Sequence, residues 1–186
     1  MIWSKESTST SSSTHSRQNL RAGHFADAEA ITGLINRAFQ VERFFLDGDR
    51  IRLDEVRARF ETGSFMVAEE GGGLTGCIYV ELRGERAYLG LLSITPERQR
   101  SGLGTLLTYA AEDFCRANGC GAVDLMIVNL RKELPVFYRR LGYVETGTAP
   151  FPEDVQTKQP CHFVKMSKPL GQKRSPEVGQ PDLRTS

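Results

Sequence analysis

The sequence lacks the features that mark membrane, secreted and nucleic-acid-binding proteins. Its apolar runs are short, and none approaches the roughly 18 residues that a membrane-spanning helix needs. The first residues contain no continuous apolar core of the kind found in secretory signals. Positive charge is not in excess, because 24 lysines and arginines stand against 23 aspartates and glutamates, a net charge of +1. These absences predict a cytoplasmic protein, with a nuclear location left open, that binds neither nucleic acid nor membrane.

Cysteine and histidine are too scarce and too scattered to predict a metal centre. The cysteines Cys77, Cys115, Cys120 and Cys161 follow no CxxC pattern, and the three histidines lie far apart in the sequence. We therefore predict that the protein holds no metal. Two disulfides would also fit an even number of cysteines, but nothing in the chain resembles a secreted protein, so we interpret them as buried free thiols.

The remaining composition predicts one globular unit between two tails. Ten of the residues 1–18 are Ser or Thr, which is too little apolar surface to offset the entropy of ordering, so this segment is predicted to be disordered. A transit peptide is a weaker interpretation, because the segment has few basic residues. Residues 171–186 are rich in Pro, Gly and charge and form a second predicted tail. Residues 19–170 are predicted to form a single α/β domain.

Hydrophobic periodicity predicts alternating strands and helices in this domain. The predicted strands are Asn19–Ala22, Ser64–Glu69, Leu74–Leu82, Ala87–Ile94, Ala122–Val128, Tyr143–Glu145 and Cys161–Met166, and the predicted helices are 26–39, Asp54–Phe60, 103–115 and 134–141. The order predicts a mixed central sheet flanked by helices, with an antiparallel meander first and a βαβ crossover later. Because Ala122–Val128 shows no clear alternation, we expect that strand to be buried on both faces.

The most informative stretch is a glycine-containing loop between the strand that ends near Ile94 and the amphipathic helix 103–115. A helix N-terminus presents unpaired N–H groups and the positive end of the helix dipole. Gly102 and Gly104 remove the Cβ atoms that would keep an anion away. The loop is therefore either an anion cradle or an ordinary glycine-rich turn. It is neither a P-loop nor a complete GxGxxG fingerprint.

Two motifs together resemble a known family. Residues Gln99–Gly104 resemble the Q/R-x-x-G-x-G/A signature of the GNAT superfamily of N-acetyltransferases, and LPVFYRRLGY at 134–143 resembles its second hallmark, a tyrosine in a short helix. Leu20, Arg21 and Ala22, followed by a helix, are similar to the family's first elements. The resemblance covers residues 19–168 and implies the GNAT fold, with acetyl-CoA as the acetyl donor.

The resemblance also implies which residues hold acetyl-CoA. Backbone amides from Arg100 to Thr105 would hold the pyrophosphate, the strand before the loop would pair with the pantetheine arm, and a bulge would separate that strand from the next. The implied residues are Leu92, Ser93, Ile94, Gln99, Arg100, Ser101, Gly102, Leu103, Gly104, Thr105 and Asn129. Arg131 occupies the position of the family's usual asparagine, so Asn129 either replaces that asparagine or caps a turn.

By the same resemblance, Tyr138 is the donor to the leaving thiolate. Full proton transfer from a phenol of pKa about 10 to a thiolate of pKa about 8.5 is uphill by about 2 kcal/mol, which favours hydrogen bonding with late transfer. The alternative is that Tyr138 is only a packed aromatic residue. The family's usual glutamate is missing from the strand at 88–93. Glu81 is our first candidate for the base, Glu42 is the second, and a water chain is the third.

The resemblance places the acceptor between segments 40–50 and 146–160. Their aromatic and acidic residues would suit a cationic, partly apolar amine, or they are simply core and solvated rim. These residues are Phe39, Phe44, Phe45, Phe151, Glu42, Asp47, Asp49, Glu153 and Asp154.

The sequence thus predicts transfer of acetyl from acetyl-CoA to an amine of a small molecule or peptide, by direct attack in a ternary complex. The alternative is a CoA-binding regulatory or inactive GNAT module. Whether the chain forms a homodimer is left open.

Overall fold

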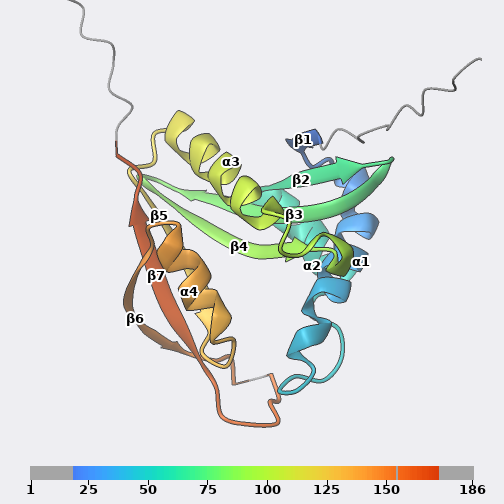
Figure 1. Cartoon of the computed structure of the whole chain (residues 1–186), viewed down its shortest axis with the longest axis vertical. Helices are drawn as coiled ribbons and strands as arrows, with labels where there is room; N and C mark the ends of the chain where they lie inside the picture. Colours follow the sequence, from blue (N-terminus) through green and yellow to red (C-terminus); the bar gives the residue numbers. More distant parts are fainter. Residues whose placement is uncertain (1–18, 154, 172–186) are drawn as a thin grey trace, which may run out of the picture.

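The computed structural model describes residues 19–153 and 155–171, and its centre is a mixed sheet of seven strands (Figure 1). The strands are β1 (Asn19–Ala22), β2 (Ser64–Glu70), β3 (Gly73–Arg83), β4 (Arg86–Ile94), β5 (Ala122–Val128), β6 (Val144–Pro150) and β7 (His162–Pro169). The helices are α1 (Ala28–Ala38), α2 (Leu53–Thr62), α3 (Leu103–Ala117) and α4 (Glu133–Arg140), with short 3-10 turns at η1 (Phe25–Asp27), η2 (Phe39–Glu42) and η3 (Pro96–Arg98). The predicted α/β class with a mixed sheet is confirmed. Apart from Gly171, the two predicted tails lie outside the described residues.

The strand order is β1-β2-β3-β4-β5-β7-β6. Strands β1 to β4 form an antiparallel meander, and β4 continues through α3 into β5, which lies parallel to it. Both the meander and the crossover were predicted from the order of elements. The insertion of β7 between β5 and β6 was not predicted, because strand order at the end of a chain depends on tertiary pairing and not on local pattern.

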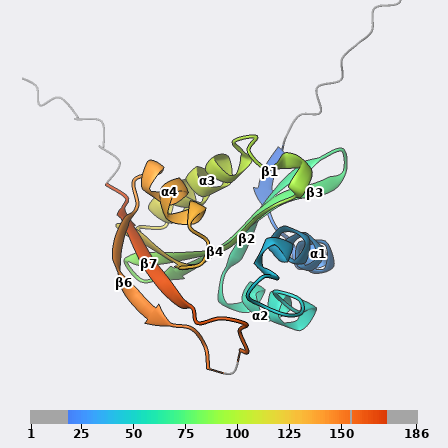
Figure 2. The same cartoon turned by 60° about the horizontal axis from the view of Figure 1, so that its bottom comes forward.

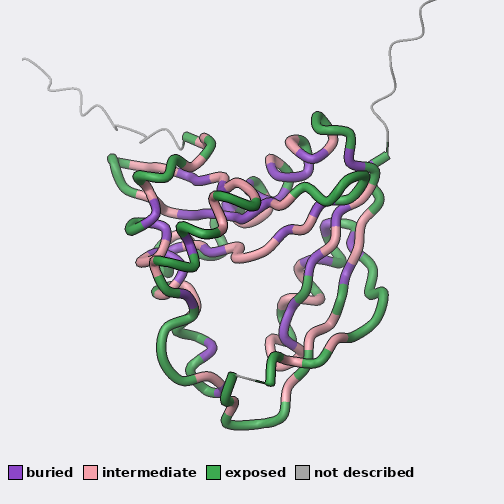
Figure 3. The backbone as a smooth tube through the Cα atoms, turned by 180° about the vertical axis from the view of Figure 1, so that it is seen from behind, coloured by how far each residue is buried: buried purple, intermediate pink, exposed green. Residues whose placement is uncertain are grey.

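Helices cover the sheet on both faces, in two separate layers (Figure 2). The spacing of Leu103, Leu107 and Ala111 on α3 places these buried residues on one stripe, which packs on one face together with α4. Ile31 and Ile35 on α1 form the matching stripe for the other face, where α2 also packs. The buried residues follow the strands and the inner sides of these helices, whereas the loops are exposed (Figure 3).

The α1–α2 layer covers only part of its face of the sheet and leaves β5 uncovered at Met126. These helices pack against β2, β3 and β4, and Met126 on β5 is 39% exposed on the same face. The prediction that Ala122–Val128 is buried on both faces is therefore wrong. Burial alternates from Ala122 to Ile127, where only the α3–α4 face is covered, and both faces are buried only at the end of the strand, at Ile127 and Val128.

The sheet ends in an edge strand that is longer than predicted. β6 runs from Val144 to Pro150 and pairs only with β7, so its outer edge is free within the described chain. Such an edge tolerates Pro150, which has no N–H to donate. None of the helices in residues 19–153 and 155–171 is long and apolar enough to span a bilayer.

Candidate active site

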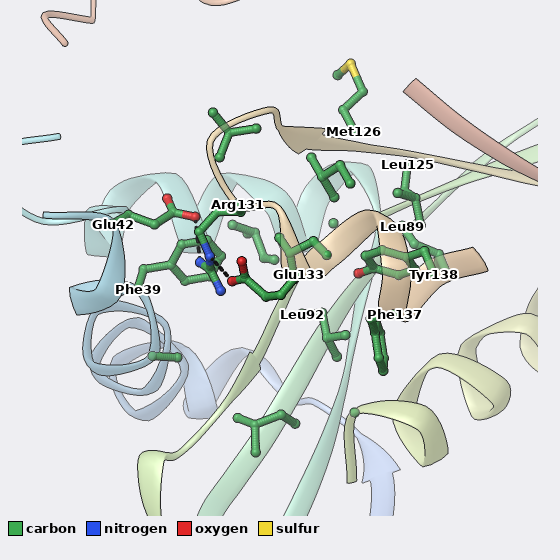
Figure 4. A pocket seen from close by; sticks show the side chains of 18 of the residues that line it. Phe39, Glu42, Leu89, Leu92, Leu125, Met126, Arg131, Glu133, Phe137 and Tyr138 are labelled. Atoms are coloured by element: carbon green, nitrogen blue, oxygen red, sulfur yellow. Dashed lines mark hydrogen bonds and ion pairs between the residues drawn. The ribbon is translucent and has the colours of Figure 1, made fainter. Parts of the chain in front are cut away.

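A cavity of about 630 Å³ opens between β4 and β5 and is lined from both faces of the sheet (Figure 4). α3, its preceding loop and α4 contribute residues from one face. η2, α2 and the segment between them contribute from the other, and the loop that precedes β7 contributes Phe151. The cavity therefore joins segments that lie far apart in the sequence.

The cavity exists because β4 and β5 separate. Their parallel pairing runs from Arg86 opposite Ala122 to Leu89 opposite Leu125 and then stops. Within β4 the register against β3 shifts between Cys77 and Tyr79, which gives β4 an extra residue, and Leu91 takes a φ of 52°. This is a β-bulge, which bends the strand and increases its twist. The N–H and C=O groups of β4 beyond Leu89 consequently have no partner on β5.

The predicted anion loop lies at one end of this slot. Arg100 has a φ of 61° and Gly102 a φ of 86°, so the chain turns through two left-handed residues before α3 begins. Left-handed and turn conformations of this kind point successive N–H groups into one concavity, to which the first turn of α3 adds unpaired donors. Glycine is the residue that adopts such a φ at little cost, which is why it stands at position 102.

The structure brings most of the predicted acetyl-CoA residues to the cavity. Those that line it are Leu92, Ile94, Gln99, Arg100, Gly102, Gly104 and Thr105. Four others do not. Ser93 is buried with its Oγ donating to the Leu91 carbonyl at 2.9 Å, the Ser101 Oγ donates to the Arg98 carbonyl at 2.6 Å, and Leu103 is a core residue.

Asn129, the fourth, holds two strands together instead of lining the cavity. Its Oδ1 accepts a hydrogen bond from the His162 amide at 2.9 Å, and its own amide donates to the His162 carbonyl at 3.0 Å. These bonds fix the end of β5 to the start of β7. They are cross-strand bonds to a residue 33 positions away, which differs from the turn cap that was the alternative interpretation of this residue.

Tyr138 lies on α4 with its hydroxyl turned into the cavity (Figure 4). Its ring packs edge-on against Phe137 and Tyr143, with centroids 4.9 and 5.4 Å away. The residue is only 7% exposed, and this burial raises the pKa of the phenol. Tyr138 is therefore a neutral hydrogen-bond donor across the physiological pH range.

A buried polar network lies behind Tyr138. The Glu112 carboxylate, which is fully buried, accepts from the Tyr143 hydroxyl at 3.0 Å and from the Lys168 ammonium at 2.7 and 2.9 Å. Because a buried charge is tolerated only when it is paired and hydrogen-bonded, this set fixes α3 against β7. Through the ring of Tyr143 it also fixes the position of Tyr138.

Glu42 lies on the opposite wall of the cavity, at the end of η2. Only 6% of the residue is exposed, although it is a carboxylate. Its Oε1 accepts from Arg131 Nη1 at 3.0 Å, and its Oε2 lies 3.8 Å from Arg50 Nε. Burial raises the pKa of Glu42, and the positive charges of Arg50 and Arg131 oppose that rise. Arg131 in turn pairs with Glu133 (Figure 4).

Glu81 does not line this cavity. Its carboxylate is bound by the guanidinium of Arg83 at 2.8 and 3.0 Å and receives a weaker contact from the Tyr79 hydroxyl at 3.5 Å. The hydrogen bond from Arg83 lowers the pKa of Glu81. The strand alternation correctly placed Glu81 on the same face as Tyr79, but no residue of β3 lines the cavity.

The two segments expected to flank the acceptor do contact each other. Leu46 and Thr157 form an isolated β-bridge, and the Lys158 amide donates to the Phe45 carbonyl at 2.9 Å. Of the aromatic residues named for this region, Phe39 and Phe151 line the cavity, Phe45 is core and Phe44 is exposed. Of the acidic ones, Glu42 lines it, Asp47, Asp49 and Glu153 are exposed, and Asp154 lies outside the described residues.

Several residues that line the cavity were missed by sequence reasoning, and among them are Tyr88, Arg50 and Arg59. Tyr88 had a usable signal, because alternation along β4 places it opposite the core residues Ala87 and Leu89. Gly90 is required beside it, since a Cβ there would lie 2.9 Å from the Tyr88 ring. Arg50 and Arg59 had no such signal, because charged residues near a short helix are usually solvated.

The described residues contain no cluster of three or more His, Cys, Asp or Glu side chains that could hold a metal ion. All four cysteines are free. Cys77, Cys115 and Cys120 are buried, whereas Cys161 is half-buried. Burial raises the pKa of Cys77 to about 12, so this thiol beneath the bulge is unreactive.

A family model and a curated relative that match this chain both describe acetyltransferases. The family model described as "Acetyltransferase (GNAT) domain" matches residues 25–170. The mycothiol acetyltransferase of Amycolatopsis mediterranei is 27% identical in an alignment of 133 positions that covers 66% of this chain and 44% of the relative. The chain thus matches less than half the length of this curated relative.

Solved structures share the fold. One is yncA from Salmonella typhimurium, with its cofactor acetyl-CoA. It has a TM-score of 0.69 at 22% identity, covering 88% of this chain and all of that one. An N-acetyltransferase from Staphylococcus aureus has a TM-score of 0.68 at 16% identity, covering 84% of this chain and 100% of that one. At these identities the similarity shows the fold.

Proposed function

The chain belongs to the GNAT acetyltransferase family, and from this premise we propose that it moves acetyl from acetyl-CoA to the nitrogen of an amine on a small molecule or peptide. One observation carries the proposal. A single cavity contains the open edge of β4, the left-handed loop before α3, the Tyr138 hydroxyl and the buried Glu42 carboxylate. These are the groups that donor binding, leaving-group stabilisation and deprotonation of the amine each require.

The residues at one end of the cavity fit acetyl-CoA, which would supply the thioester. The unpaired amides before and at the start of α3 suit a pyrophosphate, because the helix dipole favours negative charge there. Arg100 and Arg140 add positive charge on the same side, and Arg98, which also lines the cavity, is paired with Glu70. The unpaired groups of β4 beyond Leu89 suit the amide-rich pantetheine arm, which needs donors and acceptors in the pattern of a strand.

Glu42 is the base in this proposal. An alkylamine has a pKa of about 10.4 and must lose a proton before it can attack. A carboxylate whose pKa is raised by burial is a stronger base than an exposed one. Arg131 and Arg50 keep Glu42 ionised while leaving it at the cavity wall, where it can first hold the ammonium and then accept its proton.

Tyr138 stabilises the leaving sulfur in this proposal. Its raised pKa makes proton transfer to a thiolate more unfavourable than for an ordinary phenol. A hydrogen bond from the hydroxyl costs no such transfer and stabilises the charge that develops on sulfur. The edge-on packing against Phe137 and Tyr143 holds the donor in place before the reaction.

The test is thiol release from acetyl-CoA in the presence of a panel of amines that includes amino acids, polyamines, aminoglycosides, arylamines and peptides. We expect one class to release thiol well above background hydrolysis. Tyr138→Phe should lower kcat on the order of 100-fold with little change in the KM for the amine, because only the hydrogen bond to the leaving group is lost.

Two results would contradict this account. Tight binding of acetyl-CoA without thiol release for any amine would favour a CoA-binding module without catalysis. Full turnover by Tyr138→Phe at saturating substrate would remove the role of Tyr138 while leaving the transfer itself standing. Circular dichroism of the variant controls for a loss of fold.

A further inference from the structure

The acceptor side of the cavity is lined by arginines for which the proposed chemistry has no use. Arg50 precedes α2 and Arg59 lies within it, and both line the cavity. Deprotonating an amine needs a carboxylate, which Glu42 provides. A wall that bound only a cationic amine would gain nothing from further positive charge beside it.

The charges on this wall do not cancel. Arg131 is occupied by two carboxylates, Glu42 and Glu133. Arg50 reaches Glu42 only at 3.8 Å. Arg59 forms no ion pair within residues 19–153 and 155–171, and its buried Nε has no hydrogen-bond partner there. This wall therefore carries three arginines and two glutamates, which leaves an excess of positive charge. The residues are Arg50, Arg59, Arg131, Glu42 and Glu133.

The two arginines are held in place by aromatic rings. The Arg50 guanidinium lies 5.2 Å from the centre of the Phe39 ring, and that of Arg59 lies 5.1 Å from the centre of the Tyr79 ring. Stacking of this kind orients the plane of a guanidinium and leaves its N–H edge available. A planar, oriented donor edge is the arrangement that binds a carboxylate through two hydrogen bonds.

These arginines line the same cavity as Glu42 and Tyr138. Tyr88 lines the same cavity, and the charges of Arg59 and Arg50 both act on its phenol, against the rise in pKa that burial causes. Tyr138 lines this cavity as well, so Arg50 and Arg59 face the same space as the residue proposed to meet the leaving group.

The phosphates of acetyl-CoA do not explain these arginines. The loop before α3 belongs to the face of the sheet covered by α3 and α4. Arg59 belongs to α2, which packs on the other face. The positive charge at the phosphate end is supplied separately by Arg100 and Arg140, whereas Arg98 is paired with Glu70.

We propose that the acceptor carries a carboxylate beside its amine, as a free α-amino acid does, and that Arg59 and Arg50 bind that carboxylate while Glu42 holds the ammonium. This rests on the proposed function and names its substrate class. The remaining lining of the acceptor side, which includes Phe39, Phe151 and Phe163, matches an apolar side chain on the amino acid. Polyamines and aminoglycosides, which carry several positive charges and no carboxylate, do not match this wall.

The test compares acids with their amides. Thiol release from acetyl-CoA is measured with the full chain and with apolar L-amino acids, their amides, and short peptides that begin with the same residues. The amide keeps the amine, the side chain and the size but loses the negative charge. We expect kcat/KM to favour the acid over its amide on the order of 10- to 100-fold, as for a charge-assisted hydrogen bond.

Matched variants test whether Arg59 causes the preference for the acid over its amide. In Arg59→Gln the ratio of acid to amide should fall below about 3-fold, chiefly through a higher KM for the acid, whereas Arg59→Lys should keep part of it. Arg57→Gln is the control, because Arg57 is on the same helix but pairs with Glu29 at 3.8 Å and does not line the cavity. Its ratio should equal that of the unaltered chain.

Three outcomes would overturn this inference, and one of them would also overturn the proposed function. Equal rates for acids and amides in the unaltered chain overturn this inference and leave acetyl transfer intact, and this comparison needs no variant to fold. Faster turnover of peptides than of free amino acids also overturns it. Thiol release with no amine at all overturns the proposed function and this inference with it.

Discussion

The two ends of the cavity recognise their ligands by different means. At the end next to α3, recognition rests on the backbone, through unpaired amides, a left-handed turn at Gly102 and the open edge of β4. At the acceptor end it rests on the side chains of Glu42, Arg50 and Arg59, which come from segments that pack on the other face of the sheet. The backbone end suits a donor shared across a family. The side-chain end can change its acceptor by substitution without altering the fold.

The largest effect that separates the two ends is expected at Glu42. Glu42→Gln should lower kcat/KM for the amine on the order of 100- to 1000-fold, because the base is lost, while the affinity for acetyl-CoA stays within about 2-fold. The unaltered enzyme should lose activity as the pH falls through the pKa of Glu42, since only the carboxylate accepts a proton. Because burial raises that pKa, the acidic limb should lie above the ordinary glutamate value of 4.5.

A profile of kcat/KM against pH for both enzymes checks this prediction. The acidic limb should be absent from Glu42→Gln. If Glu42→Gln keeps the acidic limb of the pH profile, another group is the base, and the role of Glu42 at the acceptor end is wrong.

A smaller effect is expected at the backbone end. Gly102→Ala should raise the KM for acetyl-CoA about 10-fold, because the left-handed turn shifts and its amides lose their alignment. Gly119→Ala is the matched control. Gly119 has a φ of 83°, close to the 86° of Gly102, and an added Cβ meets nothing within 4 Å at either site. Both variants should lose about 1 kcal/mol of stability.

Thermal unfolding and acetyl-CoA kinetics of these two variants give the comparison. Equal KM values for acetyl-CoA in both would mean that the loop before α3 is only a turn. A change confined to Gly102→Ala would assign it to donor binding.

The smallest effect is expected at Glu81, which was the first sequence-based candidate for the base. Its pairing with Arg83 lowers its pKa and holds it outside the cavity. Glu81→Gln should therefore change kcat/KM by less than about 2-fold at any pH where the enzyme is stable. A loss as large as that of Glu42→Gln would reverse the assignment of these two glutamates.

The difference between the two ends also explains what the sequence could predict. The amphipathic stripe of α3, the glycines at its start and the tyrosine of α4 are local patterns. The stripe packs α3 on the sheet, and the glycines and the tyrosine line the cavity. Strand boundaries were close wherever alternation was clear. The strand β6 was cut short, because an exposed edge strand has no apolar pattern to mark its end.

The sequence could not show which side chains from distant segments meet at the acceptor end of the cavity. Glu42 and its partner Arg131 are 89 positions apart, and no local pattern shows that they meet. Glu81 had the better sequence argument, since its strand was predicted, but tertiary packing decides which strands line the cavity, and β3 does not. Asn129 matched a family position only approximately and instead joins β5 to β7. The arginines Arg50 and Arg59 carried no signal at all.

One crossed experiment tests the two-ended site most directly. Steady-state kinetics with acetyl-CoA and the best acid acceptor, each varied in turn, are measured for Gly102→Ala and Arg59→Gln. The account predicts that Gly102→Ala raises only the KM for acetyl-CoA and that Arg59→Gln raises only the KM for the acceptor. If both variants raise the KM of the same substrate, the cavity does not divide into a backbone end for the donor and a side-chain end for the acceptor, and the account is contradicted.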